Sequence, residues 1–349
     1  MSTSSTPPTD PLKEDRLNQD HATAFGWEDA DDRELKDTMR NTVNEFKKLD
    51  YRFLMPVSKV FSQSFLRKKA VRWVLLFALL PLLLYEIYKW LNLDVKQSIW
   101  LIEGYFCLFW AVYFYQIIRP SHTVWHRALL YAGFTALIGI PLLLASHELP
   151  VIKHLYAAAD HYRFLPQLLG NIFGVGVLEE LCKALPLLIF GLRKNQIRTV
   201  RDGVFLGLMS GLGFAAVEGV QYTFDATLRA IYYDTMEAAS GQFMQFIFRM
   251  MTGPVLHAAW AAMVGWFIGV AATRSQKAWP VITVGILYAA TLHGIYDVFA
   301  GQFFGIIVAG ISLMIFMFYL VHGNDSDTFV KDGSDGQSTS ISATEVSSK

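Results

Sequence analysis

Charge is scarce in this chain of 349 residues. Charged side chains make up only 17% of the sequence, against 53% hydrophobic ones, and the mean hydropathy is positive. The 30 basic and 30 acidic residues cancel, so no excess of positive charge favours nucleic acid as a partner. This composition excludes a soluble domain with a single anchor and predicts a protein that crosses the lipid bilayer several times.

Cysteine is scarce as well. The two cysteines, Cys107 and Cys182, both lie in apolar runs, which excludes a disulfide framework and a zinc ribbon. The polar stretch 1–65 contains no short apolar segment, so we expect no cleavable signal peptide.

Long apolar runs are abundant. A hydrocarbon core about 30 Å thick needs roughly 20 apolar residues per helix, and about eight segments meet this requirement. The predicted spans are 72–91, 98–118, 127–146, 168–191, 203–223, 254–273, 280–300 and 303–322. The fold class is therefore all-α, a polytopic transmembrane helix bundle of about eight spans, with a tight Gly301-Gln302 turn between the last two.

Basic residues indicate the orientation. They cluster before the first span and in every second connection, at Arg67, Lys68, Lys69, Arg72, Arg119, Arg127, Arg193, Lys194, Arg198, Arg201, Arg274 and Lys277. The other side carries a thinner scatter: Lys96, Lys153, Arg163, Arg229 and Arg249. By the positive-inside rule both termini are cytoplasmic, as an even number of spans also requires.

Three regions follow from these patterns. Residues 1–66 form a cytoplasmic N-terminal region with a disordered start and amphipathic helices at 31–49 and 56–66. The transmembrane bundle covers 67–322, with a catalytic core at 168–300, and residues 323–349 form a disordered cytoplasmic tail. The long outer connection 224–253 fits either an amphipathic surface helix or a lid.

Ionisable residues interrupt the later spans. Glu179 and Glu180 are adjacent in the apolar run 168–190, where a carboxylate costs at least a few kcal/mol. At about 1.5 Å of rise per residue, the ionisable groups of four spans reach similar depths in the outer half of the bilayer. Beyond the glutamate pair, these groups are Glu218, His257, His293 and Asp297.

Helical spacing assigns faces to these groups. Glu179 and Lys183 are four residues apart and can pair, as can His293 and Asp297. Two stripes of small residues indicate close helix packing: Gly203, Gly207 and Gly211, continued by Glu218, and Ala261, Gly265 and Gly269, preceded by His257. Each pair alone has a structural explanation, as a salt bridge or a packing histidine. Their matched depth favours a functional site.

Imidazole and carboxylate side chains favour hydrolysis. They suit zinc, which as a catalytic ion takes about three protein ligands and a water. Without metal, a carboxylate in an apolar bundle can still take a proton from water. The chain has no Gly-Ser context for a serine nucleophile, no HExxH and no GxGD, which argues against three other kinds of intramembrane protease.

Four motifs in order resemble the PrsW family of intramembrane proteases, related to the CAAX prenyl-protease (Abi/CPBP) superfamily. They are EExxK at Glu179–Lys183, FxxxE at Phe214–Glu218, a histidine opening the next core helix at His257, and HxxxD at His293–Asp297. The resemblance covers about 168–300 of the chain.

The resemblance implies hydrolysis of membrane-anchored protein substrates, such as anti-sigma factors, in a bacterial inner membrane. It implies catalytic roles for Glu179, which activates the water, and for Glu180, Glu218, His293 and Asp297, with Lys183 and Phe214 in support. Glu218, His257 and His293 are candidate metal ligands, for Zn²⁺, and a metal-free carboxylate mechanism stays open. Gly219 departs from the family, which commonly has Asn after the FxxxE glutamate.

Two other classes of function compete with a protease. A proton- or cation-coupled transporter would use the same groups to bind ions, but such folds favour broken helices and repeats, and we find no repeat in the sequence. A non-catalytic membrane scaffold would hold a partner; intact EExxK and HxxxD motifs argue against it.

Overall fold

A computed structural model describes residues 36, 37, 39–41, 43, 44, 62–232, 236–274 and 278–320, which are helical or lie in connections, without a strand. The chain divides into two compact units, Met1–Leu76 and Phe77–Lys349, and the boundary falls within helix α6 (Lys69–Leu91). A short helix, α5 (Gln63–Leu66), precedes α6. Of the predicted helix 31–49, the described residues are helical, and residues 63–66 of the predicted helix 56–66 form α5. The other residues of 1–61 and the tail 323–349 lie outside the described residues.

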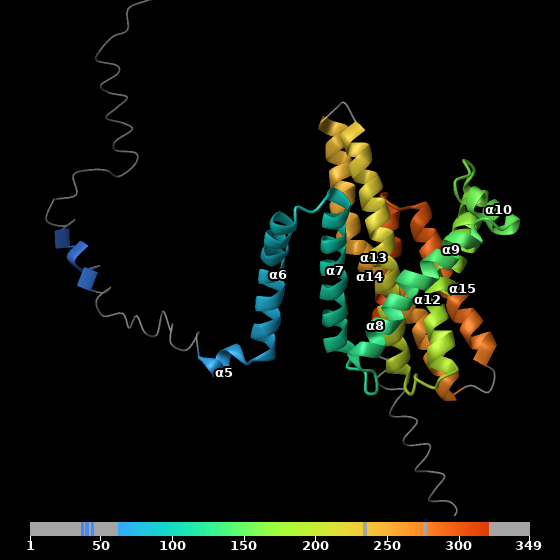
Figure 1. Ribbon diagram of the computed structural model, residues 1–349, viewed down its shortest axis with the longest axis horizontal. Helices are drawn as coiled ribbons and strands as arrows, with labels where there is room; N and C mark the ends of the chain where they lie inside the picture. Colours follow the sequence, from blue (N-terminus) through green and yellow to red (C-terminus); the bar gives the residue numbers. More distant parts are fainter. Residues whose placement is uncertain are drawn as a thin grey trace, which may run out of the picture. The chain divides into compact units, whose positions relative to one another are not determined.

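The predicted all-α membrane class is confirmed. Seven helices of the described ranges are long and apolar enough to cross a membrane: Val71–Leu91, Val95–Ile118, Trp125–Ser146, Val200–Tyr232, Ile247–Thr273, Ala278–Val298 and Phe303–Leu320. In Figure 1 they correspond to α6, α7 (Val95–Ile118), α8 (Trp125–Phe134) with α9 (Ile140–Ser146), α13 (Val200–Tyr232), α14 (Met236–Arg274), α15 (Ala278–Val298) and a last helix without a label. The predicted turn before the last helix is present, with Gly301 at a φ of 78°.

The remaining predicted span, 168–191, is a continuous but irregular helical run. It consists of α11 (Phe164–Leu169), a π-helical segment η2 (Gly170–Gly176), α12 (Val177–Pro186) and a second π-helical segment η3 (Leu187–Leu192). π-Helical turns are rare and occur frequently at functional sites. Here η2 ends directly before the α12 turn that carries the glutamate pair, so the irregularity lies next to the predicted site.

The connection 224–253 is neither a separate surface helix nor a loop-like lid. Helix α13 (Val200–Tyr232) and helix α14 (Met236–Arg274) continue through it, with 233–235 outside the described residues. Their 33 and 39 residues exceed the roughly 20 that a bilayer requires. The predicted spans ended where apolar composition ended, but polar residues do not terminate a helix, and the stretch contains no proline until Pro254.

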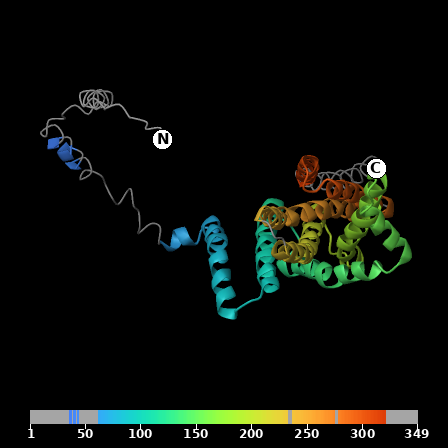
Figure 2. The same ribbon diagram turned by 90° about the horizontal axis from the view of Figure 1, so that it is seen from above.

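The two small-residue stripes form the central helix contact. A Cβ added to Gly203, Gly207 or Gly211 would lie 2.4, 2.3 or 2.4 Å from a backbone oxygen of α14, those of Gly265, Ala261 and His257 respectively. Figures 1 and 2 show α13 (yellow) and α14 (gold) side by side. Only residues without a side chain allow this approach. The contact fixes the register that sets Glu218 of α13 against His257 of α14.

We expect the substitution Gly207→Val to separate α13 from α14, because the new side chain would overlap the backbone of Ala261. Overpacking of this kind costs about 1–3 kcal/mol. Thermal unfolding in detergent, followed by circular dichroism, measures the loss. The matched control is Gly104→Val on α7, where no atom lies within 4 Å of the added Cβ; equal midpoints for the two variants would contradict the packing argument.

Candidate active site

Helix α12 places two carboxylates and an ammonium group in the interior of the bundle. Glu180 and Lys183 are 0% and 1% exposed, and Glu179 is 7% exposed. The Lys183 Nζ lies 2.8 Å from Glu180 Oε1 and 3.5 Å from Glu179 Oε2. The predicted pair of Glu179 and Lys183 therefore exists, but the closer partner of the ammonium is Glu180, three residues away on the same helix.

The ammonium of Lys183 also fixes the proton of His257. Its Nζ lies 2.9 Å from His257 Nδ1. Because an ammonium has donors and no acceptor, Nδ1 of the neutral imidazole must accept, and the ring proton is on Nε2. Nε2 lies 2.7 Å from Glu218 Oε2, to which it donates. The ring of Phe214 packs beside both groups, with its centroid 4.3 Å from Lys183 Nζ and 5.2 Å from the centroid of His257.

His293 of α15 is oriented from three sides. Its Nδ1 lies 3.0 Å from Glu180 Oε1, a carboxylate that can only accept, so Nδ1 carries the proton. Nε2 faces two further carboxylates, at 3.6 Å from Glu179 Oε2 and 3.4 Å from Asp297 Oδ2. The indole of Trp260 stacks on the imidazole at a centroid distance of 4.3 Å and an angle of 16°.

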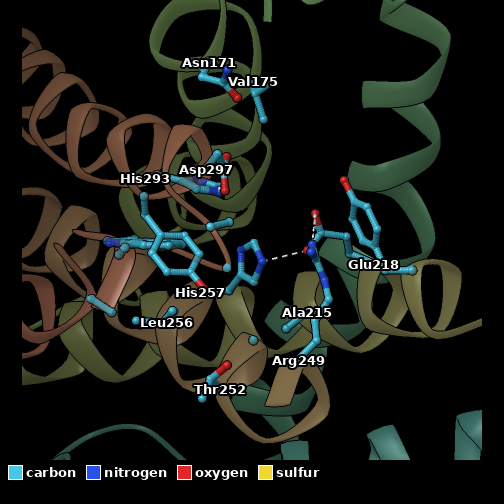
Figure 3. A pocket seen from close by; sticks show the side chains of 18 of the residues that line it. Asn171, Val175, Ala215, Glu218, Arg249, Thr252, Leu256, His257, His293 and Asp297 are labelled. Carbon is cyan, nitrogen blue, oxygen red and sulfur yellow. Dashed lines mark ion pairs between the residues drawn. The ribbon is translucent and has the colours of Figure 1, made fainter. Parts of the chain in front are cut away.

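These groups border one cavity of about 1200 Å³. Of the predicted site residues, Glu179, Glu218, His257, His293 and Asp297 line it, whereas Glu180 and Lys183 lie behind its wall. Figure 3 shows the imidazole of His257 directed at Glu218, with His293 and Asp297 on the neighbouring helix. The structure thus brings all predicted site residues together and separates those that face the cavity from those that hold them.

The predicted metal set differs from the geometric one. Ligand atoms of Glu179, His257 and His293 lie within 4.8 Å of one another. The carboxylate of the geometric set is therefore that of Glu179, whereas the sequence suggested Glu218 as the third ligand. One carboxylate and two imidazoles fit zinc in number and kind. His293 is oriented as metal-bound histidines commonly are, with its second nitrogen donating to a carboxylate. His257 uses its lone pair for Lys183, so its role as a ligand requires that this contact be exchanged.

Sequence reasoning missed two residues of the cavity wall, Arg249 and Trp260. Arg249 was counted with the scattered basic residues of the outer side. On the continuous helix α14 it lies two turns before His257, and its Nη2 is 3.9 Å from Glu218 Oε1. Trp260 is three residues after His257, on the same helix face. Helical spacing identifies Arg249 only once α14 is known to begin at Met236. Trp260 lies inside the predicted span 254–273, where its spacing from His257 was the available signal.

A third missed residue, Glu103 of α7, lies behind Glu218. It is fully buried, and its Oε1 accepts a hydrogen bond of 3.4 Å from Thr223 Oγ1. A Cβ at Gly219 would lie 2.7 Å from the Glu103 carboxyl carbon. The glycine that departs from the family pattern therefore accommodates a carboxylate of another helix. A lone acidic residue in an apolar run was the available signal for Glu103, as it was for Glu179.

Comparisons with known proteins show which family the chain is similar to. The family model described as PrsW family intramembrane metalloprotease matches residues 123–322. Protease PrsW of Shouchella clausii is 30% identical over 128 residues, 37% of this chain and 53% of the relative. Protease PrsW of Oceanobacillus iheyensis is 23% identical over 149 residues, 43% of this chain and 62% of the relative. The chain thus matches about half to three-fifths of these relatives' lengths, and no solved structure matches it.

We expect Lys183→Met to destabilise the protein by about 3–5 kcal/mol, because it leaves buried carboxylates without their cation. Removing the closest carboxylate as well, in Glu180→Gln with Lys183→Met, should restore part of the loss. Chemical or thermal unfolding in detergent measures both. A single variant as stable as the wild type would show that Lys183 does not hold this cluster together.

Proposed function

The chain belongs to the PrsW family of intramembrane metalloproteases, and on that premise we propose that it is an intramembrane endopeptidase that hydrolyses peptide bonds of membrane-anchored proteins. The observation that carries the proposal is the convergence of Glu179, His257 and His293, from three helices, on one cavity inside an apolar bundle. Peptide hydrolysis needs a water, a proton acceptor and room for the substrate. The cavity of about 1200 Å³ offers space, and the carboxylates in its wall are candidate proton acceptors.

Each side chain has a task in this proposal. In the metal-free form of the proposal, the carboxylate of Glu179 would orient the attacking water and accept its proton. Glu180 and Trp260 hold the ring of His293 so that Nε2 faces Glu179 and the cavity. Asp297, four residues after His293, borders the same cavity, with its Oδ2 3.4 Å from His293 Nε2.

Zinc is the cofactor that the donor set fits best. Glu179, His257 and His293 would hold it, and a bound zinc ion polarises a carbonyl and lowers the pKa of its water to about 7. In that form Glu218, which is hydrogen-bonded to His257 and exposed to the cavity, is the carboxylate next to the three zinc ligands that remains available as a proton acceptor. Without metal, Glu179 alone activates the water, and the two forms of the proposal are separated by metal analysis.

We further propose the bacterial inner membrane as the location, with both termini in the cytoplasm. The basic clusters in alternate connections support this orientation. The substrate is a membrane-anchored protein, of the kind that anti-sigma factors represent, whose cleavable segment reaches the outer half of the bilayer, where the carboxylates and imidazoles gather.

Cleavage is tested by co-expression with single-span membrane proteins of the host and mass spectrometry of their fragments. We expect Glu179→Gln to lower the cleavage rate by at least about 10²-fold, because the proton acceptor is lost, with membrane insertion unchanged. Glu148→Gln, an exposed outer carboxylate, is the matched control. Wild-type cleavage in the Glu179 variant would sink the proposal.

Elemental analysis of purified protein tests the metal. We expect about one zinc ion per wild-type chain and little in His293→Ala, because that substitution removes the imidazole oriented as a ligand. His154→Ala, which changes an exposed histidine, should retain the ion. Folded wild-type protein without metal, prepared without chelators, would decide for the carboxylate mechanism.

A further inference from the structure

Arg249 is a basic side chain in the wall of a cavity that also contains four carboxylates and two imidazoles. It belongs to the part of α14 that the sequence suggested as a connection, and its side chain is 35% exposed. The acidic cavity residues are Asp160, Glu179, Glu218 and Asp297, and Arg249 is the only lysine or arginine among the described lining residues. Nothing in the chemistry proposed above uses it.

Two contacts hold the Arg249 guanidinium. Its Cζ lies 3.5 Å from the centroid of the Tyr222 ring, a stacking distance. Its Nη2 lies 3.9 Å from Glu218 Oε1, an ion pair longer than a hydrogen bond. Tyr222 and Glu218 are four residues apart on α13, so one face of that helix presents both the platform and the anion. Figure 3 shows Arg249 and His257 approaching Glu218 together.

The two oxygens of Glu218 therefore have different partners. Oε2 accepts from His257 Nε2 at 2.7 Å, and Oε1 faces Arg249. The terminal torsion of a glutamate has a broad preference, so a single hydrogen bond leaves the carboxylate plane free to turn. A second, fixed cation on the other oxygen removes that freedom. A planar guanidinium stacked on an aromatic ring is suited to this task, because little of its own freedom remains to be lost.

We propose that Arg249 is a positioning residue: stacked on Tyr222, it fixes the carboxylate of Glu218 and, through it, the imidazole of His257 at the cavity. The inference rests on the proposed function, since the groups it positions are those of the hydrolytic site. The inference assigns a role to the less apolar N-terminal part of α14, which precedes His257. A continuous helix between Arg249 and His257 keeps both side chains at Glu218.

The experiment measures kcat and KM for cleavage in the full-length protein. We expect Arg249→Gln to lower kcat about tenfold or more, with KM near the wild-type value, because Glu218 is present but no longer held. Arg249→Lys keeps the charge without the planar stack and should recover part of kcat. Tyr222→Leu removes the ring and should lower kcat as Arg249→Gln does, whereas Tyr222→Phe, which keeps the ring, should retain more of kcat than Tyr222→Leu. Arg229→Gln, an exposed basic residue of α13, is the control.

Two results would overturn the inference: wild-type kcat in Arg249→Gln, or a rise in KM alone, which would make Arg249 a substrate contact. Absence of cleavage by the wild type would refute the proposed function instead. The coupling is then still measured by a double-mutant cycle of unfolding midpoints with Glu218→Gln and Arg249→Gln. Additive shifts in that cycle would count against the inference, and non-additive shifts would support it.

Discussion

The site depends on one ammonium group in the interior of a membrane bundle. Lys183 Nζ contacts Glu180 and His257 at 2.8 and 2.9 Å. The second contact sets the tautomer of His257, and the first holds the carboxylate that orients His293. By donating to His257 it places that ring's proton on Nε2, towards Glu218. By holding Glu180 it fixes the carboxylate that receives the Nδ1 proton of His293. An isolated carboxylate at this depth is expensive, so the ammonium makes the glutamate pair tolerable as well as ordered.

Helix packing brings the other partners to that ammonium. Glycines on α13 allow its backbone to touch that of α14, and the last of these contacts, at Gly211, is to the carbonyl of His257 itself. Seven residues further, the same stripe ends in Glu218. Glu218, which accepts the hydrogen bond of His257, is therefore positioned by the close packing of α13 against α14. A change in the distance between these two helices would directly alter the hydrogen bond of 2.7 Å between Glu218 and His257.

Much of this could be predicted from the sequence, for identifiable reasons. Runs of apolar residues determine spans because lipid offers no partners to a bare backbone, so α7, α15 and the last helix lie within a few residues of their predicted bounds. Spacings of four residues predicted that Glu179 shares a helix face with Lys183 and His293 with Asp297. The spacing of seven residues from Gly211 predicted the face of Glu218. The extent of α13 and α14 was not predictable, because composition marks where lipid ends and not where a helix ends. Arg249 was missed for that reason alone, and the π-helical segments flanking α12 have no pattern in the sequence.

The charges of the cluster bear on which ion it suits. Six carboxylates lie in or behind the cavity wall, at Glu103, Asp160, Glu179, Glu180, Glu218 and Asp297, and two permanent cations, Lys183 and Arg249, lie among them. Acidic groups therefore outnumber permanent cations at the site. In an apolar bundle such an excess is costly. A divalent cation between Glu179, His257 and His293 would offset more of this charge than a monovalent cation would. The same charge that makes the cluster expensive without an ion thus favours the class of ion that hydrolysis would use.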